Sequence, residues 1–163
     1  MSELSYLPFT IIGFPCNQFG HQEPGNNATE ILNGLYYVRP GLQFTPLFQL
    51  MSKVDVNGHR EHPLFSYLKE SCAVPSASNY DKTESFWNPI KVNDIAWNFE
   101  KFLIDRNGYP VLRFKPEVEP RQLRGIITIM MDETLSREEK EMYISMEVQR
   151  LEQKLQMRPN RIH

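Results

Sequence analysis

Short apolar runs and helical stripes alternate along the chain, and loops rich in Pro and Gly separate them. The run Phe9–Phe14 ends at a proline and predicts a buried strand. After a polar loop, Asn27 or Thr29 is expected to cap a short helix over Ala28–Leu35. The first third of the chain therefore predicts a strand, a loop and a helix.

The middle of the chain continues the same alternation. Residues 47–58 predict an extended segment that closes at the Asn57-Gly58 turn. Residues 62–72 place Leu64, Phe65 and Leu68 on one helical face. The polar segment Ala73–Pro89 is bounded by prolines and is long enough to predict a surface loop with a role of its own.

The clearest element lies in residues 101–114, where two apolar runs flank Asn107-Gly108 and predict a β-hairpin. The segment after it carries an apolar stripe with helical spacing, so we expect this helix to pack on the sheet. The stripe consists of Leu123, Ile126, Ile127, Met130 and Met131.

A last, highly charged helix is predicted to begin at a capping box of Ser136 and Glu139 and to end near Met157. Its apolar residues form a narrow seam of Ile144, Val148, Leu151 and Leu155. Two readings of this seam stay open: a solvated helix with one apolar edge, or a contact with another chain. Together these elements predict an α/β architecture with helices on the faces of a sheet.

Composition narrows the function classes. The 163 residues suffice for one domain, and a net charge of −2 gives no general attraction to nucleic acid or anionic lipid. No apolar run approaches the length of a membrane span, and the N-terminus does not read as a signal peptide. The histidines fall in no zinc spacing, so no metal site is expected.

Four stretches together resemble the glutathione peroxidase family: "GFPCNQFGHQEPG" (13–25), "LYYVRPG" (35–41), "KVDVNGHREHPLFSYLK" (53–69) and "WNFEKFLIDRNGYPVLRF" (97–114). The resemblance covers roughly residues 9–130. It implies a thioredoxin-like fold and reduction of hydroperoxides by a thiol, usually glutathione, which would be a co-substrate with no further cofactor.

The family's site joins a selenocysteine or cysteine to a glutamine, a tryptophan and an asparagine. The resemblance assigns these roles to Gln18, Trp97 and Asn98. Amide NH₂ groups and an indole N–H are donors, and donors aimed at a chalcogen anion favour its charged, nucleophilic form. None of the three titrates near neutral pH, so the proton must be handled by the nucleophile, the substrate or water.

The resemblance also implies that the nucleophile lies upstream of the strand ending in "GFPCNQF". We therefore expect a thioredoxin-like domain over residues 1–132 that lacks its first core strand and nucleophile turn, and a helical extension over 133–163. Cys16 is expected to be inert packing rather than a substitute nucleophile. Loss of that strand would separate Phe9–Phe14 from Lys101–Asp105, so the isolated chain is expected to be poorly folded and inactive.

The resemblance implies the glutathione-using branch, because Leu42–Phe48 has no cysteine where other members carry a resolving one. The loop Ala73–Pro89 resembles an insertion of the oligomeric members, and "LKESCAVPS" is similar to the secreted ones. Arg39 and Arg113 are candidates for holding glutathione carboxylates. Leu42 and Gln43 stand where the family usually has glycines, so this subunit-contact loop is expected to differ. A homo-oligomer is expected; the parent product would be secreted, and the chain expressed as it stands would be cytoplasmic.

Two function hypotheses follow. The first is a peroxidase of the oxidative stress response that reduces hydrogen peroxide and organic hydroperoxides with glutathione. The alternative is a non-catalytic, truncated subunit that acts through protein contacts, through the 73–89 loop or the C-terminal seam.

Overall fold

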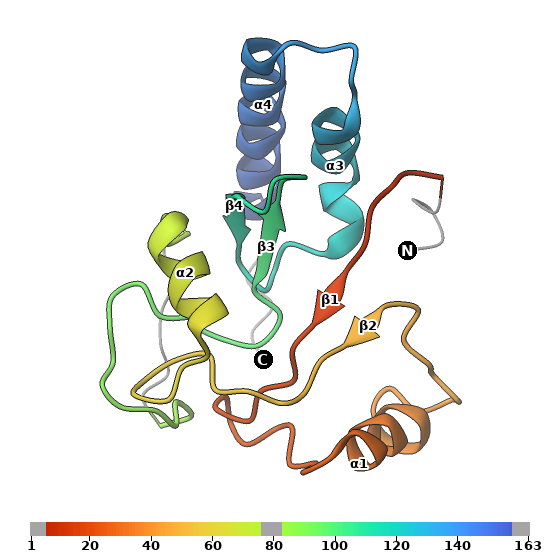
Figure 1. Ribbon diagram of the computed structural model, residues 1–163, viewed down its shortest axis with the longest axis vertical. Helices are drawn as coiled ribbons and strands as arrows, with labels where there is room; N and C mark the ends of the chain where they lie inside the picture. The colour runs from red at the N-terminus through yellow and green to blue at the C-terminus, as the bar shows by residue number, and fades with distance from the viewer. Residues whose placement is uncertain (1–5, 76–82, 158–163) are drawn as a thin grey trace.

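Four short strands form two separate sheets in the computed structural model, which describes residues 6–75 and 83–157 (Figure 1). Strand β1 (Ile12–Gly13) pairs in parallel with β2 (Gln49–Leu50), and β3 (Lys101–Ile104) pairs antiparallel with β4 (Pro110–Phe114). The expected separation of the first apolar run from the hairpin is observed, because β1 and β3 belong to different sheets. Only two residues of the predicted strand Phe9–Phe14 pair with a neighbouring strand, so the observed strand is shorter than predicted.

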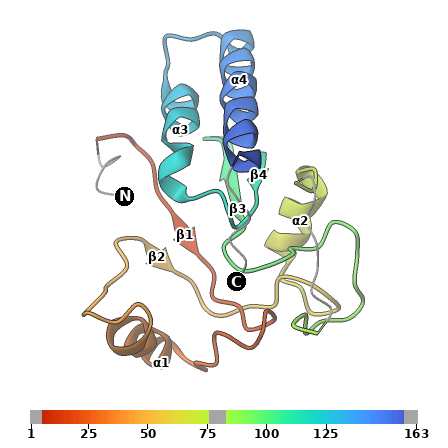
Figure 2. The ribbon, with the colours of Figure 1, turned by 180° about the vertical axis from the view of Figure 1, so that it is seen from behind.

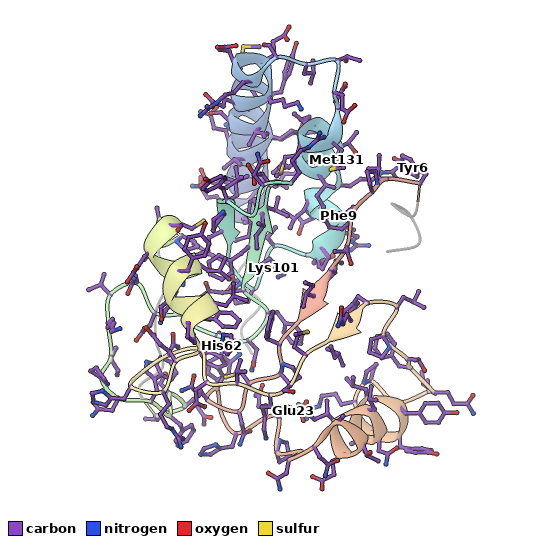
Figure 3. All side chains as sticks on the ribbon, in the orientation of Figure 1. Tyr6, Phe9, Glu23, His62, Lys101 and Met131 are labelled. Atoms are coloured by element: carbon purple, nitrogen blue, oxygen red, sulfur yellow. The ribbon has the colours of Figure 1, made fainter. Side chains whose placement is uncertain are left out.

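The helices of the N-terminal half begin where local caps predict. Helix α1 (Ala28–Asn33) is capped by Asn27, whose side-chain oxygen accepts a hydrogen bond from the Glu30 N–H at 3.0 Å. A π-helical turn, η2 (Gly34–Val38), continues it. Helix α2 (Pro63–Ser71) starts with proline at its first position, where no N–H is needed, and its N-cap is His62 (Figure 3).

The C-terminal half consists of the hairpin and three helical segments. A 3₁₀ turn, η3 (Pro120–Leu123), leads into α3 (Arg124–Met131), and α4 (Arg137–Gln156) follows. The predicted capping box of α4 is confirmed, because Ser136 and Glu139 exchange backbone-to-side-chain hydrogen bonds of 2.8 and 3.2 Å. Helices α3 and α4 stand beside each other at one end of the molecule, as both Figure 1 and the reverse view in Figure 2 show.

One hydrophobic cluster joins the hairpin to α3 and α4. Its buried members are Leu103, Phe114, Val118, Leu123, Ile126, Ile127 and Leu151, and the α4 seam residues Ile144, Val148 and Leu155 pack against them. Phe9 and Met131 also pack against this cluster, and Figure 3 shows both beside α3. The seam is thus the one apolar edge of a largely exposed helix, as the first interpretation expected, and this edge packs within the chain. The contact with another chain stays a prediction.

A second hydrophobic cluster lies under α2 and the loops that follow β1 and β2. Its buried members are Cys16, Phe19, Val56, Phe65, Leu68 and Ile95. Trp97 of the loop before β3 and Phe102 of β3 are partly buried against them. Of the predicted site residues, Trp97 thus packs against this cluster.

Two backbone positions depart from ordinary geometry where the sequence departs from the family pattern. Leu42 and Gln43 have φ of 54° and 62°, the left-handed region that glycine adopts without strain. Leu42 is also 98% exposed. The loop therefore keeps a glycine-type backbone without the glycines.

Candidate functional site

Gln18 lies in the interior, where backbone groups occupy its amide. Its side-chain oxygen accepts hydrogen bonds from the N–H groups of Val56 and Asn57 at 2.9 and 3.0 Å, and its NH₂ donates to the Asn57 carbonyl at 2.9 Å. Only 6% of Gln18 is exposed. The amide thus fastens the end of the first strand segment to the Asn57-Gly58 turn.

Asn57 in turn is hydrogen-bonded to the loop before β3. Its side chain accepts a hydrogen bond from the Ile95 N–H and donates one to the Ile95 carbonyl, both at 2.9 Å. Lys69 of α2 donates to the same Asn57 oxygen and forms ion pairs with the partly buried Glu61 and the buried Asp94. Buried charges are tolerated when they are paired and hydrogen-bonded in this way.

Arg113 of β4 holds the same loop from the other side. Its guanidinium donates to Glu100 at 2.7 Å and to the carbonyls of Asn93 and Asp94 at 2.9 Å each. The side chains of Arg113 and Glu100 are fully or almost fully buried. Arg113 therefore braces residues 93–100; its expected contact with glutathione stays a prediction.

The braced loop presents Trp97 and Asn98. The Trp97 ring lies 5.8 Å from the Phe19 ring, and its indole N–H has no hydrogen-bond partner among the described residues. Because no buried side-chain nitrogen or oxygen there lacks a partner, this N–H is open to solvent. Phe99 follows with φ of 65° and 82% exposure, a strained conformation for an aromatic residue.

Gln22, which we did not single out from the sequence, is the amide that meets Asn98. The Asn98 NH₂ donates to the Gln22 side-chain oxygen at 3.0 Å, across 76 positions of sequence. The turn at Gly20 and His21, with φ of 58° and 49°, carries the chain from buried Gln18 to exposed Gln22. The glycine in "QFGHQ" was the available signal that the second glutamine, not the first, lies on the surface.

The other predicted residues lie apart from this group. The exposed Arg39 follows η2, and its side chain has no partner among the described residues. Cys16 and Cys72 are buried free thiols, and burial raises the pKa of each. Residues 76–82 of the predicted surface loop lie outside the described part; Phe86 of that loop donates its backbone N–H to the Gln18 carbonyl.

The described residues contain no group of three or more His, Cys, Asp or Glu side chains that could hold a metal ion. Within the same residues, no helix is long and apolar enough to cross a membrane. Gln22, Trp97 and Asn98 carry uncharged hydrogen-bond donors: two amide NH₂ groups and one indole N–H. Such donors can orient a peroxide and stabilise developing negative charge.

Comparison with known proteins identifies the family. The glutathione peroxidase family model matches residues 2–69. The chain is 57% identical to rat epididymal secretory glutathione peroxidase over 112 residues, which cover 69% of this chain and 50% of that protein. The chain belongs to the glutathione peroxidase family. It is also 48% identical to mouse glutathione peroxidase 6 over 132 residues, covering 81% of this chain and 59% of that protein.

A solved structure described as T. cruzi GPX1 has a TM-score of 0.48 and 30% identity, covering 76% of this chain and 60% of that chain. The chain thus spans about half the length of the curated glutathione peroxidases that it matches. Family membership and the mixture of helices and strands confirm the predicted α/β, thioredoxin-like class.

Proposed function

We propose that the natural protein in which this chain occurs reduces hydrogen peroxide and organic hydroperoxides with glutathione as the thiol co-substrate. Family membership supports the reaction class. The observation that carries the site is the hydrogen bond between Gln22 and Asn98, the residue that follows Trp97 in the same loop. Three uncharged donors from segments far apart in sequence suit an anionic nucleophile and a peroxide oxygen.

Within this group Gln22 takes the role that the sequence suggested for Gln18. Gln18→Ala would leave the N–H groups of Val56 and Asn57 without partners, so its effect would be on stability. In the natural enzyme, Gln22→Ala is expected to lower kcat/KM for the hydroperoxide by about 10²-fold without lowering the thermal midpoint. Unchanged kcat/KM in Gln22→Ala would contradict the assignment.

The 163 residues alone are proposed to have no peroxidase turnover, because neither thiol suits a nucleophile. A thiolate is the reactive form, and burial raises the pKa of Cys16 and Cys72, so little thiolate exists at neutral pH. An aromatic disulfide reagent is expected to react with both thiols much more slowly in the native chain than after denaturation. The native rate is expected to rise as pH approaches the raised pKa. A coupled glutathione and NADPH assay of the isolated chain is expected to give the background rate, and turnover well above it would refute this part.

A non-catalytic subunit remains the second candidate, and an apolar surface favours it. Tyr37, Val38, Leu42 and Leu47 are each at least 73% exposed in one segment after α1. Apolar surface of this kind marks contact sites. Light scattering is expected to show a homo-oligomer that Val38→Asp with Leu47→Asp dissociates; a monomer at micromolar concentration would refute the contact.

The parent protein is proposed to pass through the secretory pathway. The relatives include epididymal secretory glutathione peroxidases from rat and mouse, with 57% and 55% identity to this chain. Detection of the natural protein in secreted fluid rather than in cell extract tests this proposal.

A further inference from the structure

The loop that leads into α1 carries the sequence Asn27-Ala28-Thr29. An asparagine followed by any residue but proline and then Ser or Thr is the acceptor motif for N-linked oligosaccharide. Asn27 is the only asparagine of the printed sequence in such a motif. We propose that Asn27 is an N-glycosylation site, an inference that rests on the proposed passage through the secretory pathway.

The motif is accessible throughout. Residues 26–30 are all exposed, and Asn27 has the extended backbone of a helix N-cap, with φ of −141° and ψ of 169°. Pro24 and Gly25 precede it in an irregular loop. A bulky, hydrated glycan at this position projects from the surface and displaces no core side chain.

The hydrogen bonds of Asn27 are compatible with the modification. Its oxygen accepts from the Glu30 N–H at 3.0 Å, and its NH₂ donates to a Glu30 carboxylate oxygen at 2.8 Å. Glycosylation replaces one of the two amide hydrogens and leaves the oxygen free to accept. The cap of α1 therefore survives, and the remaining N–H can still donate to Glu30.

The nascent chain also presents the motif in a usable form. Helix α1 has six residues, fewer than the roughly 12–15 that an isolated helix needs to be even marginally stable in water. Before tertiary packing forms, Asn27 and Thr29 are thus in extended, mobile chain. An oligosaccharide-transferring enzyme that reads the motif before folding meets no helix to unwind.

The reaction is a group transfer from a lipid-linked oligosaccharide diphosphate. The Asn27 amide nitrogen forms a bond to the anomeric carbon of the first sugar, and the bond from that carbon to the diphosphate oxygen breaks. The lipid diphosphate leaves, and the amide nitrogen gives up one proton. No oxidation or reduction takes place.

The test directs the complete 163-residue chain into the secretory pathway of mammalian cells with a cleavable leader. Cell lysate and medium are both analysed, so a chain that is retained is still scored. We expect a mobility shift of one glycan that peptide N-glycosidase removes, with conversion of Asn27 to Asp in the peptide mass spectrum. The readout is independent of peroxidase activity, so it separates failure of this site from failure of the proposed reaction.

Matched variants locate the modification. Asn27→Asp keeps an N-cap oxygen and Thr29→Ala keeps Asn27 itself, yet both are expected to abolish the shift. Thr29→Ser is expected to retain it. A chain without an enzyme-sensitive shift, or a shift that persists in Asn27→Asp, would overturn the proposal.

Discussion

Leu42 adopts a left-handed backbone conformation that is unfavourable for a residue other than glycine. A left-handed conformation costs a non-glycine residue about 1–2 kcal/mol, and the extra unfolded-state entropy of glycine offsets about 0.5–1 kcal/mol of that. Leu42 has φ of 54° and an almost fully exposed side chain, so glycine loses no packing there. Leu42→Gly is therefore expected to raise the free energy of unfolding by about 0.5–1 kcal/mol in urea titrations.

The control for this prediction is Leu42→Ala, which keeps the same backbone requirement and is expected to gain nothing. A glycine variant no more stable than the alanine variant would show that φ at this position carries no strain. The sequence alone identified the position, because Leu42 and Gln43 replace glycines expected there, but it could not say whether the loop would keep its shape.

The two glutamines differ through contacts that the sequence around them does not predict; the catalytic role expected for Gln18 stays a prediction. Gln18 and Gln22 are both loop amides near an apolar strand, and their sequence context offers only the intervening glycine to distinguish them. The distinction arises from non-local contacts: Gln18 meets Val56 and Asn57, whereas Gln22 meets Asn98. Such pairings across 38 or more positions are not encoded in any short motif.

At the scale of elements, the loop of residues 93–100 depends on one arginine of β4. Removing one partner of a buried ion pair leaves the other charge uncompensated, at a cost of about 3–5 kcal/mol. Arg113→Ala is therefore expected to lower the free energy of unfolding by about that amount in chemical denaturation. Arg39→Ala, at an exposed position, is expected to change it by no more than about 0.5 kcal/mol.

Both arginines were candidates for glutathione binding in the sequence, so comparing the two variants separates their roles. Equal, small effects on stability would contradict the bracing role of Arg113. If only Arg39→Ala lowers the affinity for glutathione, Arg39 and not Arg113 contacts this substrate.

Helix α4 is an integral element of the fold through its seam. Leu151 is buried against the cluster shared by β3, β4 and α3, and a Leu→Ala change in such a position costs about 2–5 kcal/mol. We expect Leu151→Ala to lower the urea midpoint clearly. Met146→Ala on the exposed side of the helix is the control, with an expected change within about 0.5 kcal/mol, and similar effects of the two would contradict the packing.

Helices were more predictable than sheets for a physical reason. The starts of α1 and α4 were predicted from Asn27 and Ser136 because caps are local hydrogen bonds. The hairpin was predicted from Asn107-Gly108 for the same reason. The pairing of β1 with β2, and the docking of the α4 seam, depend on which distant surfaces meet.

At the scale of the whole molecule, the buried charges couple stability to pH. Burial by itself raises the pKa of Glu61, but hydrogen bonds from Lys69, Lys91 and Ser66 outweigh it and hold the pKa below its ordinary value. A lowered folded-state pKa contributes stability above the unfolded pKa of about 4.3, and this is lost as pH falls through the folded value. The free energy of unfolding is expected to drop in that acid range.

Glu61→Gln tests this coupling, because it removes the titrating group and keeps a hydrogen-bonding side chain. The variant is expected to be less stable at neutral pH and to lose less stability between neutral and acid pH than the parent chain. Parallel stability curves against pH for the two proteins would rule out Glu61 as a source of the acid sensitivity. The expectation that the isolated chain is poorly folded overall stays a prediction.

The bond between Asn98 and Gln22 has a consequence for how a reactant would be received. At rest, one N–H of the Asn98 amide donates to the Gln22 oxygen, so a reactant that takes this N–H gains only the difference between two similar contacts, typically a fraction of a kcal/mol. That N–H would then add little to the ground-state affinity for a peroxide. Selectivity among peroxides would then arise in the transition state, where the leaving oxygen becomes negative and these hydrogen bonds become stronger.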